Sequence, residues 1–330
     1  MSEATKNVNT IQAINLALDH ALAEDPRVLV FGEDVADREE GGVVGVTKGL
    51  STKHGASRVR STPISEQAIV GAAIGASIAG MRPVAEIMLM NFTAVAMDMI
   101  TNHAAKLRFM SGGQTSVPLT IRTMTGAGFS TGGQHSDFLE AWFAHTAGLK
   151  VVVPSTPADA YGLLLSCIDD EDPCIFVENM VSYWTPGEPP VPGRRIALGK
   201  ANIVREGSDV TVIGYSRQVA DISAVAEKLA KEGISVEVID LRTISPLDTD
   251  TVLNSVAKTR RAVVVHEAVK NFGVGAEVAA RIQEELFGQL KAPVRRVASA
   301  FCPVPFAKPL EAAFVPGQDQ IEATIRSTLD

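Results

Sequence analysis

The sequence predicts an α/β protein with two doubly wound parallel-sheet domains. Apolar strand-like runs alternate with segments of helical period along the chain, which is typical of parallel sheets that carry helices on both faces. Residues 83–90 contain few polar positions, as expected of a central strand. The segment TPGEPPVPGR at 185–194 holds four prolines and two glycines and interrupts the alternation. We therefore expect domains at 1–185 and 196–330, joined by a linker at 186–195.

Composition and charge exclude several classes of protein. The 330 residues are 46% hydrophobic and 21% charged, which is ordinary for globular domains. The 38 acidic residues outnumber the 30 basic ones, and no dense Lys/Arg run is present, so nucleic acid is not an expected partner. The three cysteines lack metal-ligand spacing and no signal peptide is visible, which favours a cytoplasmic location. The longest apolar run, 68–81, is too short to span a bilayer, so no membrane association is expected.

The elements of the first domain follow from periodicity and punctuation. Residues 10–24 have apolar positions at helical spacing and close at Asp25-Pro26. Residues 27–31 form the first strand, and the loop after it contains three glycines within 41–45. This loop is either a simple connection or a ligand-facing segment. The remaining predictions are a helix that begins near Glu66, a strand at 83–90, a helix at 93–109, strands at 117–124 and 149–153, a helix at 158–168 and a strand at 174–178.

After the linker the alternation starts again and predicts a second, smaller parallel-sheet domain. The predicted strands are 210–214, 235–241, 262–266 and 294–298, and the predicted helices are 218–231, one after Pro246, 275–287 and 320–329.

Glu66 is the most informative single residue. Pro63 biases Thr62 toward extended backbone, and Ser65 can cap a helix that begins near Glu66 and then carries no charge to residue 79. A helix that is apolar all round is expected to be buried. Glu66 is then either a first-turn glutamate that complements the helix dipole or a desolvated carboxylate that exchanges a proton with a ligand.

Three side chains lie just past predicted strand ends, namely Glu66, Phe92 and His135. Ligands of doubly wound sheets bind beyond the carboxyl ends of strands, so we group these residues as a candidate site. Common alternatives are absent, because the sequence has no Walker loop, no G-x-G-x-x-G after the first strand and no G-x-S-x-G. The acidic run 169–172 is either a cation site or a solvated turn. His266 is expected to be a packed histidine.

Six separated motifs carry a resemblance that covers nearly the whole chain. They resemble the beta subunit of the thiamine-diphosphate-dependent component of 2-oxo acid dehydrogenase complexes, with a pyrimidine-binding domain followed by a transketolase C-terminal-like domain. The motifs are FGEDV (31–35), RVRSTPISEQAIVGAAIGASIAGMRPVAEI (58–87), AAKLRFMSGG (104–113), GGQHS (132–136), LKVVVPSTPADAYGLL (149–164) and EVIDLRTISPLD (237–248).

The resemblance implies a role for each candidate residue. Glu66 matches the glutamate that hydrogen-bonds a ring nitrogen of the cofactor's aminopyrimidine and favours its imino tautomer. Phe92 matches the aromatic residue packed on that ring, and Ile64 belongs to the same wall. His135 matches the active-site histidine that can donate a proton during acyl transfer to a lipoyl group.

The resemblance also implies partners and ions. The GDG motif that holds Mg²⁺ and the diphosphate does not occur here, so an alpha subunit should supply it within a heterotetramer of two alpha and two beta chains. The lipoyl acyltransferase component is the implied acyl acceptor. In some members potassium binds near positions that correspond to Leu119, Cys167, Ile168, Asp170 and Asp172.

The substrate remains open at the level of sequence. The segments 90–92, 110–114 and 178–179 resemble pyruvate-type members and favour pyruvate, whereas a branched-chain 2-oxo acid or acetoin is an alternative. Asp137 stands where the family commonly has glutamine, and Phe301-Cys302 replaces a common polar pair. Two other functions remain, namely the pyrimidine-binding half of a split transketolase and a non-catalytic docking subunit.

Overall fold

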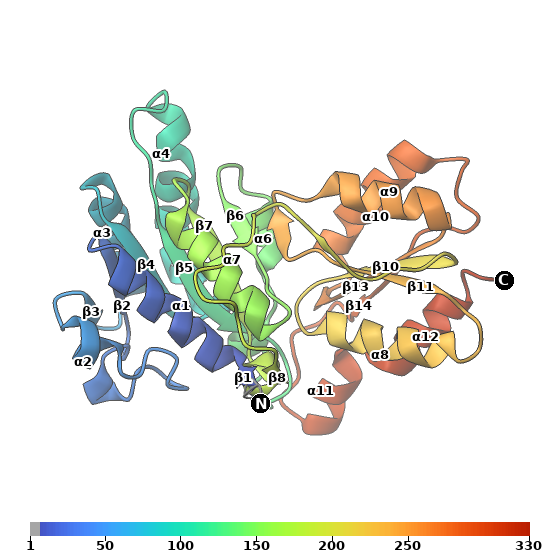
Figure 1. Ribbon diagram of the computed structural model, residues 1–330, viewed down its shortest axis with the longest axis horizontal. Coiled ribbons are helices and arrows are strands. Elements are labelled where there is room, and N and C mark those ends of the chain that lie inside the picture. The colour runs from blue at the N-terminus through green and yellow to red at the C-terminus, as the bar shows by residue number, and fades with distance from the viewer. Residues whose placement is uncertain (1–6) are drawn as a thin grey trace, which may run out of the picture. The chain divides into compact units, whose positions relative to one another are not determined.

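The computed structural model describes residues 7–330, which form two compact units (Figure 1). The first unit is the chain up to Thr125 with Trp142–Leu198, and the second is Gly126–Ala141 with Gly199–Asp330. The segment predicted as a linker is packed onto the first unit, because β8 (Pro186–Gly187) pairs with β1 (Val8–Asn9). Arg195 also binds Asp169 through a 2.9 Å ion pair. The boundary therefore falls after Leu198, later than the prolines suggested.

The sheet of the first unit runs in the order β6-β7-β5-β4-β2-β3, and every neighbouring pair among these strands is parallel. The predicted parallel α/β architecture is thus confirmed, and the carboxyl ends of these strands share one edge. β4 and β5 lie inside the sheet and are almost wholly buried. The strands are β2 (Val28–Gly32), β3 (Val59–Ser61), β4 (Arg82–Leu89), β5 (Thr120–Thr125), β6 (Lys150–Val152) and β7 (Cys174–Asn179).

Helix α1 (Thr10–Glu24) has the predicted bounds. Asn9 caps it, since its side chain accepts from the Gln12 amide and the Gln12 side chain accepts from the Asn9 amide. The apolar face of α1, including Ile14 and Leu18, is buried and packs along α7 (Pro157–Asp169), as Figure 1 shows. Burying each of these side chains stabilises the fold by about 1.5–3 kcal/mol. The other helical segments are η1 (Asp37–Glu39), α2 (Leu50–His54), α3 (Glu66–Ile78) and η4 (Val181–Trp184).

The structure differs from two of the helix predictions in the first unit. The helix expected at 93–109 is a 3₁₀ segment η2 (Met90–Ala96), a π segment η3 (Met99–Ala104) and α4 (Ala105–Met110). The Thr93 hydroxyl donates to the Met90 carbonyl and competes with the regular helical pattern there. Helix α3 begins at Glu66 as predicted, but it is buried on one face only. Nothing among residues 7–330 covers the face with Ala68, Ala72 and Gly75.

The sheet of the second unit runs in the order β14-β13-β10-β11-β9. Its first four strands are parallel as predicted, whereas β9 is an antiparallel edge strand whose half-exposed residues gave no clear strand pattern. Figure 1 shows α9 and α10 on one face of this sheet and α8 and α12 on the other. The strands of this sheet are β9 (Asn202–Arg205), β10 (Val210–Gly214), β11 (Val236–Asp240), β13 (Ala262–Val269) and β14 (Arg295–Ser299), and the short strand β12 (Thr243–Ser245) is not part of it.

Helices and short turns complete the fold. They are α5 (Gly133–Ser136), α6 (Glu140–Ala144), α8 (Gln218–Ala230), α9 (Thr249–Thr259), α10 (Val274–Leu286), α11 (Lys308–Phe314) and α12 (Gln318–Arg326). None of the helices in residues 7–330 has the length and apolar character needed to cross a membrane.

Candidate functional site

Glu66 lies at the amino end of α3, beyond the carboxyl ends of the parallel strands in the first unit's sheet. The strand before it, β3, pairs in parallel with β2, and the Thr62 amide donates to the Gly32 carbonyl at 2.8 Å. This bond fixes the chain where it leaves the sheet, and α3 then starts within four residues. The Glu66 side chain is only 9% exposed although Ser65 makes no side-chain cap. The structure therefore places the predicted carboxylate in a desolvated position at a helix amino end.

A second carboxylate, Glu33, lies at the same edge and was not singled out by the sequence argument. It follows β2 directly and is 7% exposed. Burial raises the pKa of Glu33, and the negative charges of Glu66 and Asp34 raise it further. The Oε1 atom of Glu33 is buried and has no hydrogen-bond partner among residues 7–330. The carboxyl ends of β2 and β3 thus hold two neighbouring acids, and the charge of Glu66 helps to raise the pKa of Glu33.

Phe92 follows the next strand along the sheet. It lies in η2, immediately after β4, and packs half-buried against the core of the first unit. Because β3, β2 and β4 are consecutive in the sheet, Glu66, Glu33 and Phe92 all follow neighbouring strand ends. Ile64 lies two residues before Glu66 and is 82% exposed. In the first unit alone, the part of the cofactor pocket that was predicted to include Ile64 is therefore open to solvent.

His135 belongs to the second unit, within Gly126–Ala141. Carboxylates of that unit hold the segment by its backbone: the Ala127 amide donates to Glu267 at 2.6 Å and the Gly128 amide donates to Glu311 at 2.8 Å. Gly132 has φ +73°, and a Cβ there would lie 2.5 Å from the Phe306 ring. Any other residue would be strained by this backbone angle and would have to displace the Phe306 ring. The part of the loop that precedes His135 is therefore fixed by long-range contacts.

Glu140 forms a further buried acid five residues after His135. It is fully buried, and burial raises its pKa to about 7 although the Tyr215 hydroxyl donates to it at 2.6 Å. Tyr215 stacks on His266 with ring centroids 6.1 Å apart. Burial lowers the pKa of His266 to about 4, in agreement with the packed, neutral histidine expected from the sequence.

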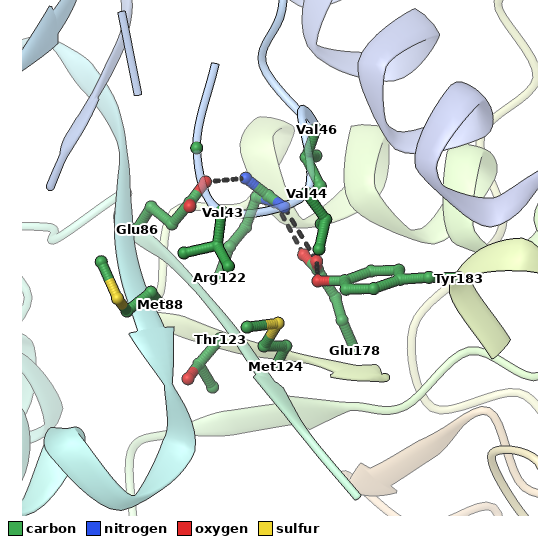
Figure 2. Close-up of a pocket in the computed structure, with 11 residues that line it drawn as sticks. Val43, Val44, Val46, Glu86, Met88, Arg122, Thr123, Met124, Glu178 and Tyr183 are labelled. Carbon is green, nitrogen blue, oxygen red and sulfur yellow. Dashed lines mark hydrogen bonds and ion pairs between the residues drawn. The ribbon is translucent and has the colours of Figure 1, made fainter. Parts of the chain in front are cut away.

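A buried charge cluster lies under the glycine-containing loop at 41–45. Figure 2 shows the Arg122 guanidinium between two carboxylates, 2.6 Å from Glu86 and 2.7 Å from Glu178. Burial by itself would lower the pKa of Arg122, but the charges of Glu178 and Glu86 raise it above its ordinary value. The cavity beside this charge cluster has a volume of about 10 Å³, which is too small for a ligand. We therefore interpret the loop at 41–45 as a simple connection and not as a ligand-facing segment.

The residues proposed for potassium surround the turn after α7. The Lys150 ammonium lies 2.6 Å from the Asp170 carboxylate, and Arg82 donates to the carbonyls of Ile168 and Asp170 at 3.0 and 3.1 Å. Arg108 pairs with Asp172 at 2.8 Å. Among the described residues, no group of three or more His, Cys, Asp or Glu side chains is arranged to hold a metal. The Leu119 and Cys167 carbonyls accept from the Cys174 and Asp170 amides at 2.8 and 3.3 Å.

Comparison with known proteins identifies the family. Residues 6–183 match the family described as "Transketolase, pyrimidine binding domain", and residues 199–321 match "Transketolase, C-terminal domain". The chain is 48% identical over 325 residues to "Acetoin:2,6-dichlorophenolindophenol oxidoreductase subunit beta" of Cupriavidus necator, with 96% of each chain covered. It is 45% identical over 321 residues to "Pyruvate dehydrogenase E1 component subunit beta" of Staphylococcus epidermidis, with 97% and 98% covered.

The chain belongs to the family of 2-oxo acid dehydrogenase beta subunits. Among solved structures it resembles "Split gene transketolase, inactive beta4 tetramer" with a TM-score of 0.81, covering 98% of this chain and 99% of that one. The identity is 22%, so this likeness shows a shared fold and nothing more.

In this dehydrogenase beta subunit, Glu66 and Phe92 lie on the domain that matches the pyrimidine-binding family, whereas His135 lies within that sequence match but in the second compact unit. Sequence reasoning missed Glu33 and Glu140. Glu33 lies within the FGEDV motif and directly after a strand end, so the rule that grouped Glu66 with Phe92 could have found it. Glu140 gave no such signal, because its burial depends on Tyr215, 75 residues away.

Proposed function

We propose that this chain is a catalytic dehydrogenase beta subunit that, with an alpha subunit, cleaves a small carbonyl substrate on thiamine diphosphate and passes the acyl group to a lipoyl domain. The observation that carries the proposal is the buried carboxylate of Glu66 at the sheet edge, in a chain 43–48% identical to named dehydrogenase beta subunits. A subunit that only docks partners has no need of a desolvated acid at this edge.

Features of the first unit fit an aminopyrimidine. Glu66 is a buried acid at a strand end, Glu33 presents an orphaned buried oxygen, and Phe92 is a half-buried aromatic residue. Bound thiamine diphosphate would supply an acidic thiazolium carbon that attacks the substrate carbonyl and stabilises the negative charge left there. Glu66 would hold a proton at the ring nitrogen, and burial keeps that proton from water.

The other residues assist in distinct ways. Phe92 would pack on the pyrimidine ring. Ile64 would form part of the same pocket wall once a partner subunit covers its exposed side chain. Glu33, whose pKa is raised by burial and by the charges of Glu66 and Asp34, would lie beside Glu66 at the same strand ends. His135, held by its anchored loop, would donate a proton to the acceptor sulfur as the acyl group transfers.

The proposal includes partners that this chain requires. Because no GDG motif occurs in the sequence, an alpha subunit would hold the diphosphate through Mg²⁺, and two alpha and two beta chains would form a heterotetramer. The lipoyl acyltransferase would accept the product. We also propose that a potassium ion binds near the carbonyls of Leu119, Cys167 and Ile168 and the side chains of Asp170 and Asp172. The proposed location of the protein is the cytoplasm.

The substrates named for the relatives are pyruvate and acetoin, and both contain an acetyl group. Acetyl transfer is therefore the proposed outcome. The sequence pattern favours pyruvate, and acetoin and branched-chain acids are the alternatives. A split transketolase is less favoured, because its likeness to this chain is restricted to the fold.

The replacement Glu66→Gln tests the proposal. It keeps the size of the side chain but removes the exchangeable proton, so we expect kcat of the reconstituted alpha–beta complex to fall at least about 100-fold. Turnover is followed with an artificial electron acceptor, and size-exclusion chromatography checks assembly. Glu284→Gln, on the exposed face of α10, is the matched control and should retain full activity. Equal activity of wild type and Glu66→Gln would contradict the proposal.

A further inference from the structure

Glu311 of α11 binds the backbone of the loop that carries His135. Its Oε1 atom accepts from the Gly128 amide at 2.8 Å, and its Oε2 atom accepts from the Ser130 amide at 3.0 Å. The Ser130 hydroxyl donates to the same Oε2 atom at 3.4 Å. The Glu311 side chain is 3% exposed, so water competes little for these bonds. Hydrogen bonds from amides to a carboxylate are about twice as strong as those between neutral groups.

The loop backbone at these positions is not one that its own residues favour. Ser130 has φ +56°, in the left-handed region that residues other than glycine seldom adopt. Strained backbone of this kind persists only where the surrounding contacts hold it in place. The bonds from Glu311 are made to Ser130 itself and to a residue two positions before it. The carboxylate therefore stabilises the loop at its strained position.

The same part of the chain also contacts the loop closer to the histidine. A Cβ at Gly132 would lie 2.5 Å from the ring of Phe306, which shows how closely the loop backbone approaches this ring. The His135 amide in turn donates to the Gly132 carbonyl at 3.1 Å. The loop is thus supported from Ser130 to the turn that precedes the histidine. A shift of the backbone at Ser130 is expected to move the His135 side chain.

The step assigned to His135 depends on such placement. When an acyl group passes to a lipoyl dithiolane, a carbon–sulfur bond forms as the sulfur–sulfur bond breaks. The two electrons left on the acyl carbon reduce the disulfide, the released sulfur takes a proton, and the acyl carbon then separates from the cofactor. A proton donor must lie within hydrogen-bonding reach of that sulfur, and a misplacement of about 1 Å can slow such a step about 100-fold.

We propose that Glu311 is a positioning residue for acyl transfer, which holds the loop at 126–137 so that His135 can protonate the released sulfur. The catalytic part of this inference rests on the proposed function, whereas the hold on the loop can be measured without turnover. Because Glu311 acts through His135, its effect should be confined to the step that uses the histidine.

Amide hydrogen exchange of the full-length chain measures the loop directly. In Glu311→Gln, peptides from 126–137 should exchange at least about tenfold faster than in the wild type, because their bonds to the carboxylate are weakened. Glu267 still accepts from the Ala127 amide, so the second unit should remain folded. Glu311→Asp keeps the charge but has a shorter reach, and it should give a smaller increase. Glu284→Gln, on the exposed face of α10, is the matched control and should exchange like wild type.

Two assays of the reconstituted alpha–beta complex separate positioning from a general structural effect. Turnover with an artificial electron acceptor needs no proton for a lipoyl sulfur, whereas acylation of a free lipoyl domain, followed by mass spectrometry, does. Glu311→Gln should lower kcat of lipoyl acylation at least about tenfold and leave its KM and the artificial-acceptor rate within about twofold. His135→Gln should show the same pattern, and the double variant should lose no more than His135→Gln alone, since both changes affect one step.

Three results would overturn the proposal: unchanged exchange of the loop in Glu311→Gln, an equal loss in both assays, or a double variant whose loss is the product of the two single losses. A wild-type complex that does not acylate the lipoyl domain would contradict the proposed function instead. The exchange measurement would then still decide whether Glu311 holds the loop.

Discussion

At the scale of single residues, Glu140 shows how burial controls a carboxyl group. Its pKa of about 7 lies well above the ordinary value of 4.5, so the folded chain favours the protonated acid. The folded state is penalised as pH rises from about 4.5 to 7, because the unfolded chain ionises first. Above pH 7 the penalty is complete, at about 3 kcal/mol. At pH 4 and below, it is absent.

The change Glu140→Gln should therefore stabilise the second unit at pH 8 by up to about 3 kcal/mol and have little effect at pH 4. Glutamine can still accept the Tyr215 hydrogen bond through its carbonyl oxygen. Amide hydrogen exchange of peptides from residues 199–330 measures the stability of this unit. As a control, Tyr215→Phe removes the hydrogen bond and should destabilise at both pH values. A gain of equal size at pH 4 and pH 8 would refute this account of Glu140.

At the scale of elements, three strands meet at one buried cation. Arg122 on β5 pairs with Glu86 on β4 and Glu178 on β7, and all three side chains are nearly inaccessible to solvent. Replacing Arg122 with methionine fills similar space but leaves two carboxylates buried without their partner. We expect a loss of about 3–5 kcal/mol in the free energy of unfolding.

Urea unfolding followed by tryptophan fluorescence measures this loss, because Trp142 and Trp184 both belong to the first unit. The triple variant Arg122→Met with Glu86→Gln and Glu178→Gln carries no charge in the cluster. It should recover most of the loss, since well-packed neutral groups can replace a buried ion cluster. If the triple variant is as unstable as Arg122→Met, lost packing rather than unpaired charge is responsible.

The turn after α7 allows a test of potassium at the same scale. Its carbonyls already accept from Arg82, and Asp170 is held by Lys150, so the turn is ordered without an ion. If potassium also binds there, KCl at ten times its Kd should add about 1.4 kcal/mol of stability over NaCl. That corresponds to roughly 3 °C in Tm. Asp170→Asn should abolish the difference, and equal Tm values in both salts for the wild type would remove potassium from the site.

Structural features that depend on neighbouring residues in the sequence could be predicted, whereas features that depend on contacts between distant residues could not. The bounds of α1 follow from its apolar period. The start of α3 at Glu66 was predicted from Pro63 and Ser65, although Ser65 makes no side-chain cap. The π segment at Met99–Ala104 was missed because its amino acids also suit an α-helix. Gly126–Ala141 joins the second unit through bonds from Ala127 and Gly128 to acids 140 and 183 residues away. No local pattern encodes such partners, so neither the unit boundary nor the anchoring of the His135 loop could be predicted.

At the scale of the whole molecule, the chain presents surfaces that fit an incomplete enzyme. Ile64 is 82% exposed beside the buried Glu66, and none of residues 7–330 covers the uncharged face of α3 around Gly75. A Cβ at Gly75 would meet no atom of the described residues within 4 Å, so the packing of residues 7–330 does not require glycine there. An exposed glycine inside a helix costs about 1 kcal/mol relative to alanine. Close approach of another chain would account for it.

The isolated beta chain should therefore bind thiamine diphosphate poorly even with Mg²⁺, since it lacks the motif for the diphosphate. Mixing with the alpha subunit should strengthen binding at least 100-fold, because the diphosphate and the pyrimidine are then held together. Isothermal titration calorimetry measures both affinities. Gly75→Leu, which adds bulk to the open face of α3, should leave the isolated chain folded but prevent assembly, and Glu284→Gln should assemble normally. Tight cofactor binding by the beta chain alone would mean that its site is complete without a partner.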